Sequence, residues 1–432
     1  MRMDVKAAMS TPEELICYNF ESSAQTMTAT QTSTTQPSAI PTNGHYYAFL
    51  VFYLVFLSAL GSFVNDMYSP ALPAMCRFFG CSIPIAQMGL TMGMVGLGVG
   101  QLILGPLSDH YGRKKVLLGS LLLFIVAAVA SVFSPSIHVF NTCRLFQGMG
   151  ASGGYFLART IPADLYSGRT LARFMALVGA INGIAPASAP VLGGITSERF
   201  GWQAVFVFLA IIAAVILLLS PCLKESLPPS RRTKGAWWKA LPGYITLLKN
   251  RPFMIHVSFK ATALGLLFAY ISASPFILQN HYGMSQTVYG LVIGANAISV
   301  AVGSMAALRF RPLKKAARAG SLILAAGIIP QAIALYTIHS IWVFEACMVV
   351  ALFGLGLIFS TTNTLAMNEG RAKAGEASAI LGVAGYVIGA IVAPLVGMGN
   401  VMHSTAIVFV ALTILILICC HGSKKLAPDL LE

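Results

Sequence analysis

Apolar runs of about 20 residues recur along almost the whole chain, and this recurrence constrains the fold more than any other sequence feature. A helix rises about 1.5 Å per residue, so a run of that length spans the hydrocarbon core of a bilayer. The chain is 56% hydrophobic and only 10% charged, whereas a soluble domain carries about 25% charged residues. The sequence therefore predicts an all-α integral membrane protein surrounded by a lipid bilayer.

The apolar runs fall into two sets, separated by a polar and basic segment at residues 222–251. Spans of the first set are predicted at residues 46–74, 86–107, 116–133, 137–162, 171–194 and 202–220. Spans of the second set are predicted at residues 253–276, 288–308, 320–336, 341–365, 374–396 and 404–420. The sequence thus predicts about twelve transmembrane helices in two six-helix halves, at residues 45–221 and 252–421, joined by a central loop at 222–251.

Lys and Arg are concentrated in alternate loops between the predicted spans, and these residues resist transfer across a membrane. One set of loops contains Arg113, Lys114, Lys115, Arg169, Arg173, Arg231, Arg232, Lys234, Lys239, Arg309, Arg311, Lys314, Lys315, Arg318, Arg371 and Lys373. The opposite set contains little beyond Arg77 and Arg199. We therefore predict that both termini and the central loop are cytoplasmic. The same bias accounts for most of the formal net charge of +14, so no nucleic-acid partner is expected.

The two ends of the chain differ from the spans in composition. Residues 1–44 include TMTATQTSTTQPSAIPTNG, which is rich in Ser, Thr and Pro and predicts a disordered cytoplasmic tail. Residues 422–432 are expected to form a short cytoplasmic C-terminal tail. Eight cysteines are scattered without metal-ligand spacing, so no metal site is expected. Cys76 and Cys81 share the first outer loop, where they either form a disulfide in an oxidising compartment or remain free.

The stretch GPLSDHYGRKK, residues 105–115, joins the second and third predicted spans. Gly105 and Pro106 are expected to end a helix, and Gly112 permits a turn with a positive φ. Asp109 can bond the nearby Arg113, which predicts a tight turn locked by charge. The alternative is that Asp109 caps a helix and Arg113 only sets the topology.

Glycine and proline are concentrated in the predicted fifth span, in the stretch GAINGIAPASAPVLGG at residues 179–194. Glycines let neighbouring backbones approach closely, and prolines soften a helix where bending is useful. The residues concerned are Gly179, Gly183, Pro186, Pro190, Gly193 and Gly194. The stretch therefore serves either a gating motion or the ordinary packing of small residues.

The loop stretch at residues 105–115 resembles the G-x-L-S-D-x-x-G-R-[KR] signature of the major facilitator superfamily, where it latches the inner gate of the outward-open state. The stretch RLFQGMGA, residues 144–151, is similar to the R-x-x-Q-G-x-G pattern of that family's fourth span. Residues 179–194 resemble its antiporter signature in the fifth span, except that Ala185 stands where a glycine usually precedes the first proline. The family often places an acidic partner for the loop arginine at the position of Asp164. The resemblance therefore implies an inner-gate cluster of Asp109, Arg113 and Asp164.

The stretch NDMYSPALP resembles the D-M-Y-x-P-A-L-P signature of the Bcr/CflA group of drug-resistance transporters. Residues 270–290 look like that group's seventh-span exit, so the resemblance covers nearly the whole chain after residue 45. It implies export of compounds such as bicyclomycin, chloramphenicol-type drugs and sulfonamides in exchange for protons. Some members of the group move small metabolites instead. The resemblance also implies a monomer in a bacterial cytoplasmic membrane.

Asp66 and Arg144 are the outstanding opposite charges that the first half places within the membrane. At about 1.5 Å per residue, Asp66 lies roughly two-thirds to three-quarters of the way along an inside-to-outside helix, at a depth comparable with that of Arg144. Charges at such depths usually pair or face a polar cavity. We hypothesise that Asp66 takes up and releases a proton during transport and that Arg144 helps to set its pKa. The alternative is a permanent ion pair that orients the first and fourth spans.

Several polar and aromatic residues line a cavity if they face inward, although each alone is compatible with helix packing. They are Tyr68, Gln101, Gln147, Tyr155, Asn182, Tyr270, Asn296, Asn363 and Tyr386. As aromatics and amides with few charges, this set suits an amphiphilic drug. Lys260 in the seventh span either reaches the cytoplasmic edge or faces the cavity, where it favours neutral or anionic substrates. Glu345 is expected to be a boundary residue near the outer mouth.

No motif indicates an enzyme or an ATP-driven pump. The chain lacks a metal-binding motif such as HExxH, and it lacks a Gly-rich phosphate loop followed by Lys and Ser or Thr. The sequence therefore predicts a secondary transporter that needs no cofactor, takes its energy from a proton gradient and has a small molecule and protons as its partners. Drug export is the favoured function, and proton-linked export or import of a specific metabolite is the alternative.

Overall fold

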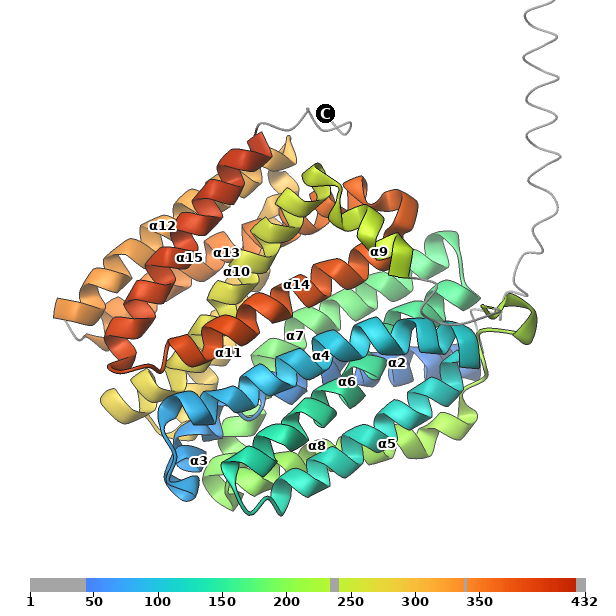
Figure 1. Cartoon of the computed structure of the whole chain (residues 1–432), viewed down its shortest axis with the longest axis horizontal. Helices are drawn as coiled ribbons and strands as arrows, with labels where there is room; N and C mark the ends of the chain where they lie inside the picture. The colour runs from blue at the N-terminus through green and yellow to red at the C-terminus, as the bar shows by residue number, and fades with distance from the viewer. Residues whose placement is uncertain (1–43, 234–240, 338–339, 425–432) are drawn as a thin grey trace, which may run out of the picture.

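The structure, a computed structural model, describes residues 44–233, 241–337 and 340–424 of the chain. Its first half contains α2 (His45–Asp66), α3 (Leu72–Phe79), α4 (Ile83–Tyr111), α5 (Arg113–Val132), α6 (Ile137–Leu165), α7 (Gly168–Phe200) and α8 (Trp202–Leu219). Its second half contains α10 (Arg251–Pro275), α11 (Gln286–Ala306), α12 (Leu313–Thr337), α13 (Ile341–Glu369), α14 (Ala374–Leu395) and α15 (Val401–Lys424). These helices form one bundle, and the described residues contain no strand (Figure 1). The predicted all-α fold is confirmed.

The helices have the lengths that a membrane requires. Eleven helical segments among the described residues are long and apolar enough to cross a bilayer. α6 is as long as α4, at 29 residues, but polar residues such as Arg144 and Arg159 lower its hydropathy. It packs against α2, α4 and α5 inside the first half, so neighbouring helices rather than lipid surround much of its surface.

The first span is broken, contrary to the single helix predicted at residues 46–74. α2 ends at Asp66, a 3₁₀ turn covers Ser69–Ala71, and α3 follows. Pro70 and Pro73 explain the break, because a proline lacks the N–H that continues a helix but is tolerated in the first turn of a new one. Asp66 therefore stands at a helix end within the 35-residue membrane segment.

The two halves repeat one pattern of helix packing. α6 contacts α2, α4 and α5, and α13 contacts α10, α11 and α12 in the same way. Likewise, α5 packs on α8 as α12 packs on α15. Contacts between the halves are concentrated in two helix pairs, α7 with α11 and α4 with α14. This equivalence is the structural counterpart of the two sets of apolar runs in the sequence.

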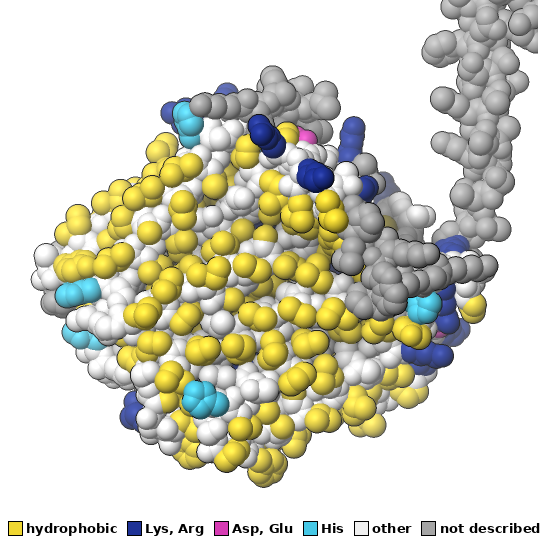
Figure 2. Space-filling model, in the orientation of Figure 1, with side chains coloured by type: hydrophobic (Ala, Val, Ile, Leu, Met, Phe, Trp, Pro, Cys, Tyr) yellow, Lys and Arg dark blue, Asp and Glu magenta, His cyan; other side chains and the backbone are white. Residues whose placement is uncertain are grey.

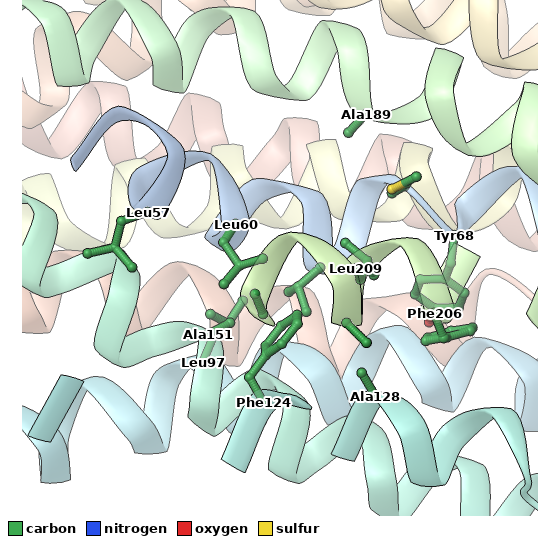
Figure 3. Packing of buried hydrophobic residues seen from close by; sticks show 14 of the residues in the cluster. Leu57, Leu60, Tyr68, Leu97, Phe124, Ala128, Ala151, Ala189, Phe206 and Leu209 are labelled. Carbon is green, nitrogen blue, oxygen red and sulfur yellow. The ribbon is translucent and has the colours of Figure 1, made fainter. Parts of the chain in front are cut away.

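Most buried apolar side chains of each half form a core of their own, and the first core also includes Phe268, Phe276, Ala390 and Ala393 from the second half. Figure 3 shows part of the first core, in which Leu57, Phe124, Phe206 and Leu209 come from three different helices. The second core includes Leu266, Phe344 and Phe409. Lipid is as apolar as these side chains, so close packing rather than removal from water stabilises the helix contacts.

The two ends of the bundle differ in charge. Figure 2 shows a broad hydrophobic surface over the middle of the helices and most visible Lys and Arg side chains towards the end where α9 (Leu241–Leu248) lies. We call this the basic end; it includes the connections after α4, α6, α8, α11 and α13. The other end, which holds the connections after α3, α5, α7 and α10, is called the opposite end. The charge separation matches the alternation of basic loops along the sequence, and the orientation in the membrane stays a prediction.

Segments outside the spans differ in part from the prediction. The central segment is not only a loop, since it contains α9 and a short 3₁₀ turn at Pro229–Arg231, and another 3₁₀ turn, Ser220–Cys222, ends at its first residue. α15 continues to Lys424, three residues beyond the predicted end of the second half. Most of the predicted tails, at residues 1–43 and 425–432, lies outside the described residues.

Cys76 and Cys81 are free thiols in this structure. The thiol of Cys76 donates a 2.8 Å hydrogen bond to the carbonyl oxygen of Cys81. Burial, with a further contribution from the neighbouring Cys76, raises the pKa of the Cys81 thiol to about 11. Of the two states left open by the sequence, the structure contains the reduced one.

Candidate functional site

Arg144 is fully buried in α6 and is held by neutral groups. Its Nη2 donates to the carbonyl oxygen of Val64 at 2.7 Å and to Oδ1 of Asn65 at 3.0 Å. Its Nη1 donates to the amide oxygen of Gln147, one turn further along α6. The guanidinium also lies over the ring of Tyr68, 4.3 Å from the centroid, in cation–π geometry. Arg144 therefore fixes the end of α2 to α6.

Asp66 directly follows the residues that Arg144 holds, but its carboxyl group has different surroundings. Asp66 is partly buried, and it forms no ion pair with Arg144 within the described part of the chain. Its carboxyl group instead acts electrostatically on Tyr289 of α11 and Tyr386 of α14. Asp66 therefore lies within electrostatic range of the second half, while Arg144 holds the preceding turn from within the first half.

The sequence predicted comparable depths for Asp66 and Arg144, but it did not predict which groups each of them contacts. Asp66 belongs to the last turn of α2, and Arg144 of α6 contacts that same turn. In this conformation Arg144 bonds the Val64 carbonyl oxygen and the Asn65 side chain instead of the Asp66 carboxylate. The structure also contains no ion pair between these two residues, so it does not show the alternative of a permanent pair. Asn65 is a member of the site that sequence reasoning missed, although it immediately precedes Asp66.

Hydrogen bonds close the opposite end of the molecule across the two halves. The donors and acceptors are Gln279 Nε2 to Pro70 O at 2.8 Å, Gln87 Nε2 to Ser272 O at 2.9 Å, Thr287 N to Glu198 Oε2 at 2.7 Å, and Ser197 Oγ to Gln286 Oε1. A further bond joins Thr91 Oγ1 of α4 to Ala390 O of α14 at 3.0 Å. The structure is therefore closed at the opposite end.

Only the last part of the glycine and proline stretch of α7 makes close contacts at the closed end. Gly193 lies against the carbonyl oxygen of Met67, and Gly194 lies against the backbone of Gln286. A β-carbon at either position would overlap the neighbouring backbone, so these approaches require glycine. Gly179 and Gly183, which lie nearer the basic end, have no neighbouring atoms within 4 Å of such a β-carbon. Pro186 and Pro190 lie between the two pairs, inside the helix.

The loop motif forms a hydrogen-bonded cluster at the basic end. Arg113 Nη1 lies 2.5 Å from Asp109 Oδ1, and Arg113 Nε lies 2.8 Å from Asp164 Oδ2. The hydroxyl of Ser108 accepts a bond from Nη1 at 2.6 Å, and Glu225 accepts one from the Arg113 backbone at 2.9 Å. The structure thus brings together the three predicted residues and adds Ser108 and Glu225, which sequence reasoning missed.

The helix end predicted at Gly105 and Pro106 is wrong. Both residues lie inside α4, which continues to Tyr111 and is capped by Gly112 at a φ of +101°. The turn is therefore later and tighter than predicted, and Asp109 and Arg113 face each other across it at i, i+4. Within the described residues, the bonded partners of Arg113 come from the first half and the central segment, so the cluster is intact while the opposite end is closed.

The residues predicted to line a cavity are divided among three environments. Tyr68 and Gln147 are fully buried around Arg144, and Tyr270 and Asn296 are buried in the second half, so these four do not line an accessible surface in this conformation. Asn296 Nδ2 bonds the Tyr270 hydroxyl at 2.7 Å and Glu345 Oε2 at 2.8 Å, so Glu345 is part of an internal network rather than a boundary residue. The side chain of Asn182 lies outside what the structure describes.

The remaining predicted residues lie where the two halves face each other. Gln101 of α4 approaches Gly382 of α14, and Tyr386, one turn further along α14, is affected electrostatically by Tyr155 and Asp66. Asn363 of α13 accepts a 2.7 Å hydrogen bond from Lys260 Nζ. Lys260 therefore bonds within the second half instead of extending to the membrane edge.

Arg159 is a second charged residue within α6 that sequence reasoning overlooked. Its Nη2 donates a 2.7 Å hydrogen bond to the hydroxyl of Tyr155, and its guanidinium lies 4.4 Å from the centroid of that ring. The signal was present in the sequence, because Tyr155 and Arg159 are spaced i, i+4 on one helix face. Arg159 also lies within the fourth predicted span, at residues 137–162.

Comparison with known proteins places this geometry in context. Residues 52–420 match the family model of the Major Facilitator Superfamily. The chain is 35% identical over 374 residues to the uncharacterized MFS-type transporter YdgK of Bacillus subtilis (strain 168), across 83% of this chain and 93% of YdgK. It is 28% identical over 316 residues to a chloramphenicol resistance protein of Pseudomonas aeruginosa, across 72% of this chain and 73% of that protein.

The fold also matches solved transporter structures. A bacterial homologue of the human lysosomal transporter Spinster, in an inward-facing and unoccupied conformation, superposes with a TM-score of 0.71. The match covers 90% of this chain and 100% of that chain, at 15% sequence identity. At this identity the likeness concerns the arrangement of the helices alone.

Proposed function

The chain belongs to the major facilitator superfamily, and from this premise we propose that it exports small amphiphilic compounds in exchange for protons. It is a multi-pass membrane transporter rather than an enzyme. The proposed substrates are similar in size and character to chloramphenicol, bicyclomycin or the sulfonamides. The similarity to a chloramphenicol resistance protein supports this class of compound. We propose a bacterial cytoplasmic membrane as its location, with the basic end on the cytoplasmic side.

The position of Asp66 carries the proposal. Asp66 ends a broken helix within the membrane, and its carboxyl group lies within electrostatic range of Tyr386 of the second half. It has no ion-pair partner within the described residues. A carboxyl group that meets water from one side in one conformation and from the other side in the next changes its proton affinity between the two. Such a group couples proton movement to the conformational change.

Helix contacts near Asp66 link its protonation to opening and closing. Arg144 fixes the residues just before Asp66 to α6, and Gly193 of α7 packs on Met67 just after it. Opening the opposite end separates α7 from α11 and α4 from α14, which changes the access of water to Asp66. Alternating access then moves a proton inward at Asp66 and the exported compound outward.

The direct test uses purified protein in liposomes that contain a pH-sensitive dye. A proton gradient is imposed, and chloramphenicol-type, sulfonamide and cationic compounds are added one at a time. We expect compound-triggered proton movement in the wild type and none in Asp66→Asn. The matched control Glu369→Gln, which neutralises an exposed carboxylate at the basic end, is expected to behave as the wild type. Silence of the folded wild type across the panel would contradict drug export and favour transport of a specific metabolite.

A further inference from the structure

Two cationic side chains, one from each half, form a site that the proposed proton exchange does not use. We propose that Arg159 and Lys260 bind a negatively charged oxygen group of the transported compound. This inference rests on the proposed export function and narrows its substrates to amphiphilic organic anions, such as aromatic carboxylates or ionised sulfonamides. The ligand class follows from the charges, contacts and surroundings of the two residues.

The two cations lie at neighbouring depths in the membrane. Lys260 is nine residues from the start of α10, which is about 14 Å from the basic end. Arg159 is six residues from the end of α6, which is about 9 Å from the same end. Arg159 acts electrostatically on Lys260 and on Tyr386, although it belongs to the other half. The two positive groups therefore lie within electrostatic range of each other, one in each half.

Neither cation is neutralised by protein. Among the residues that the structure describes, the ion pairs found involve Arg113 and Arg232, and neither Arg159 nor Lys260 takes part in one. Lys260 bonds the amide oxygen of Asn363 and Arg159 bonds the hydroxyl of Tyr155, which are both uncharged. These bonds leave donors on both side chains for a further acceptor.

Two unneutralised like charges at membrane depth repel each other and are costly to keep there. An anion that binds between them removes both penalties, and it receives charge-assisted hydrogen bonds from a guanidinium and an ammonium group. Both side chains are partly exposed, so a ligand can reach them, whereas Arg144 is fully buried. The geometry therefore favours an anionic ligand and disfavours a cationic one.

The surroundings suit the apolar part of such a ligand. The Tyr155 ring lies beside Arg159, and the Tyr386 ring lies 6.0 Å from that of Phe268. Tyr155 and Tyr386, one from each half, are both partly exposed. An aromatic acid can thus place its charge between the cations and its ring against the tyrosines. Inorganic phosphate and the phosphate group of a lipid share the charge but lack the ring.

The test measures equilibrium binding to the purified full-length protein in detergent, where proton coupling plays no part. The probes are naphthoate and naphthylmethylammonium, which share a ring system and differ in the sign of their charge. We expect naphthoate to bind at least about tenfold more tightly than the ammonium compound. An excess of inorganic phosphate or of phosphatidylglycerol is expected to leave naphthoate binding unchanged. Stronger binding of the ammonium compound, or displacement of naphthoate by phosphate or by phosphatidylglycerol, would overturn the proposal.

Substitutions assign the binding to the two residues. Lys260→Gln and Arg159→Gln are each expected to weaken naphthoate binding about tenfold or more, and Lys260→Arg is expected to retain it. Lys249→Gln and Arg169→Gln, at exposed positions of the basic end, are the matched controls. Equal binding by wild type and both glutamine variants contradicts the inference, as does an equal loss in Lys260→Arg.

Failure of this inference is distinguishable from failure of the proposed function. If naphthoate does not bind while another compound still drives Asp66-dependent proton movement, the anion site is wrong and the exchange function stands. If Asp66→Asn binds naphthoate as the wild type does but the wild type moves no protons, the anion site stands and the proton exchange is wrong.

Discussion

Gly193 lies against the carbonyl oxygen of Met67 so closely that a β-carbon at position 193 would overlap that oxygen. Met67 directly follows Asp66, the residue at which α2 ends. Gly194, the next residue of α7, packs in the same way on the backbone of Gln286 in the second half. The segment of α7 that closes the opposite end is therefore also the segment that covers the helix end beside the proposed proton site.

This contact predicts the effect of a single added methyl group. Gly193→Ala should push α7 away from Met67 at a cost of about 1 to 3 kcal/mol, because neither backbone has space to give. We expect the closed opposite end to be disfavoured and transport to slow about tenfold. Gly179→Ala, where the added atom meets no neighbour, should transport normally. Equal rates for both variants, measured in liposomes, would show that the close contact does not matter for transport.

The hydrogen bonds of Arg144 predict that replacing it lowers the stability of the protein even when the positive charge is kept. Arg144→Lys keeps the positive charge but cannot reproduce bonds to Val64, Asn65 and Gln147 together, because lysine lacks the planar fork of donors. We expect a loss of about 2 kcal/mol or more in the free energy of unfolding in detergent. Arg199→Lys, at an exposed position, is the control and should unfold as the wild type does. An unchanged unfolding curve for Arg144→Lys would contradict the assigned contacts.

The cluster around Arg113 predicts a change in rate rather than in affinity. Arg113→Lys preserves the positive charge that sets topology but loses the simultaneous bonds to Asp109 and Asp164. If the cluster takes part in cycling, the maximal transport rate should fall about tenfold while the KM stays within twofold or so. A wild-type rate for Arg113→Lys would support the alternative role, in which this residue only sets the topology.

The sequence was sufficient for the broad architecture, because the length of an apolar run is local information. The all-α fold and the number of long apolar helices follow from it, while the division at residues 222–251 stays a prediction. The break at Asp66 was signalled by Pro70 and Pro73, but an uninterrupted apolar run concealed it. Conversely, Pro106 was predicted to end a helix but lies inside α4, because a packed membrane helix tolerates an internal proline.

The site was harder to predict, because residue depth does not fix the rotation of a helix about its axis. Asp66 and Arg144 were predicted at comparable depths, which does not fix where their side chains point. Arg144 binds within the first half, and the Asp66 carboxyl group lies within electrostatic range of Tyr386 of the second half. The burial of Tyr270 and Asn296 depends on which helices pack against α10 and α11, and no local pattern contains that information. The contact between Arg159 and Tyr155, in contrast, could have been predicted, because their i, i+4 spacing is visible in the sequence.

The thiols of Cys76 and Cys81, at the opposite end, predict a pH-dependent reaction. The pKa of Cys81 is raised to about 11 by burial and by Cys76, so its reactive thiolate forms only as the pH rises towards that value. Labelling of Cys81 by a membrane-impermeant maleimide should be slow at neutral pH and increase about tenfold per pH unit up to pH ~10. Mass spectrometry of the labelled peptide measures the rate. Rapid labelling at neutral pH, or a Cys76 to Cys81 disulfide in the purified protein, would contradict the structure.

The most direct test of the central claim separates substrate movement from proton drive at Asp66. Liposomes with purified wild type or Asp66→Asn are loaded with an unlabelled substrate, and the exchange of labelled substrate is measured without a pH gradient. Uphill transport driven by a pH gradient is then measured in the same preparations. The account predicts that Asp66→Asn retains exchange but loses uphill transport. Uphill transport by Asp66→Asn at the wild-type rate would contradict the assignment of Asp66 as the proton-coupling residue.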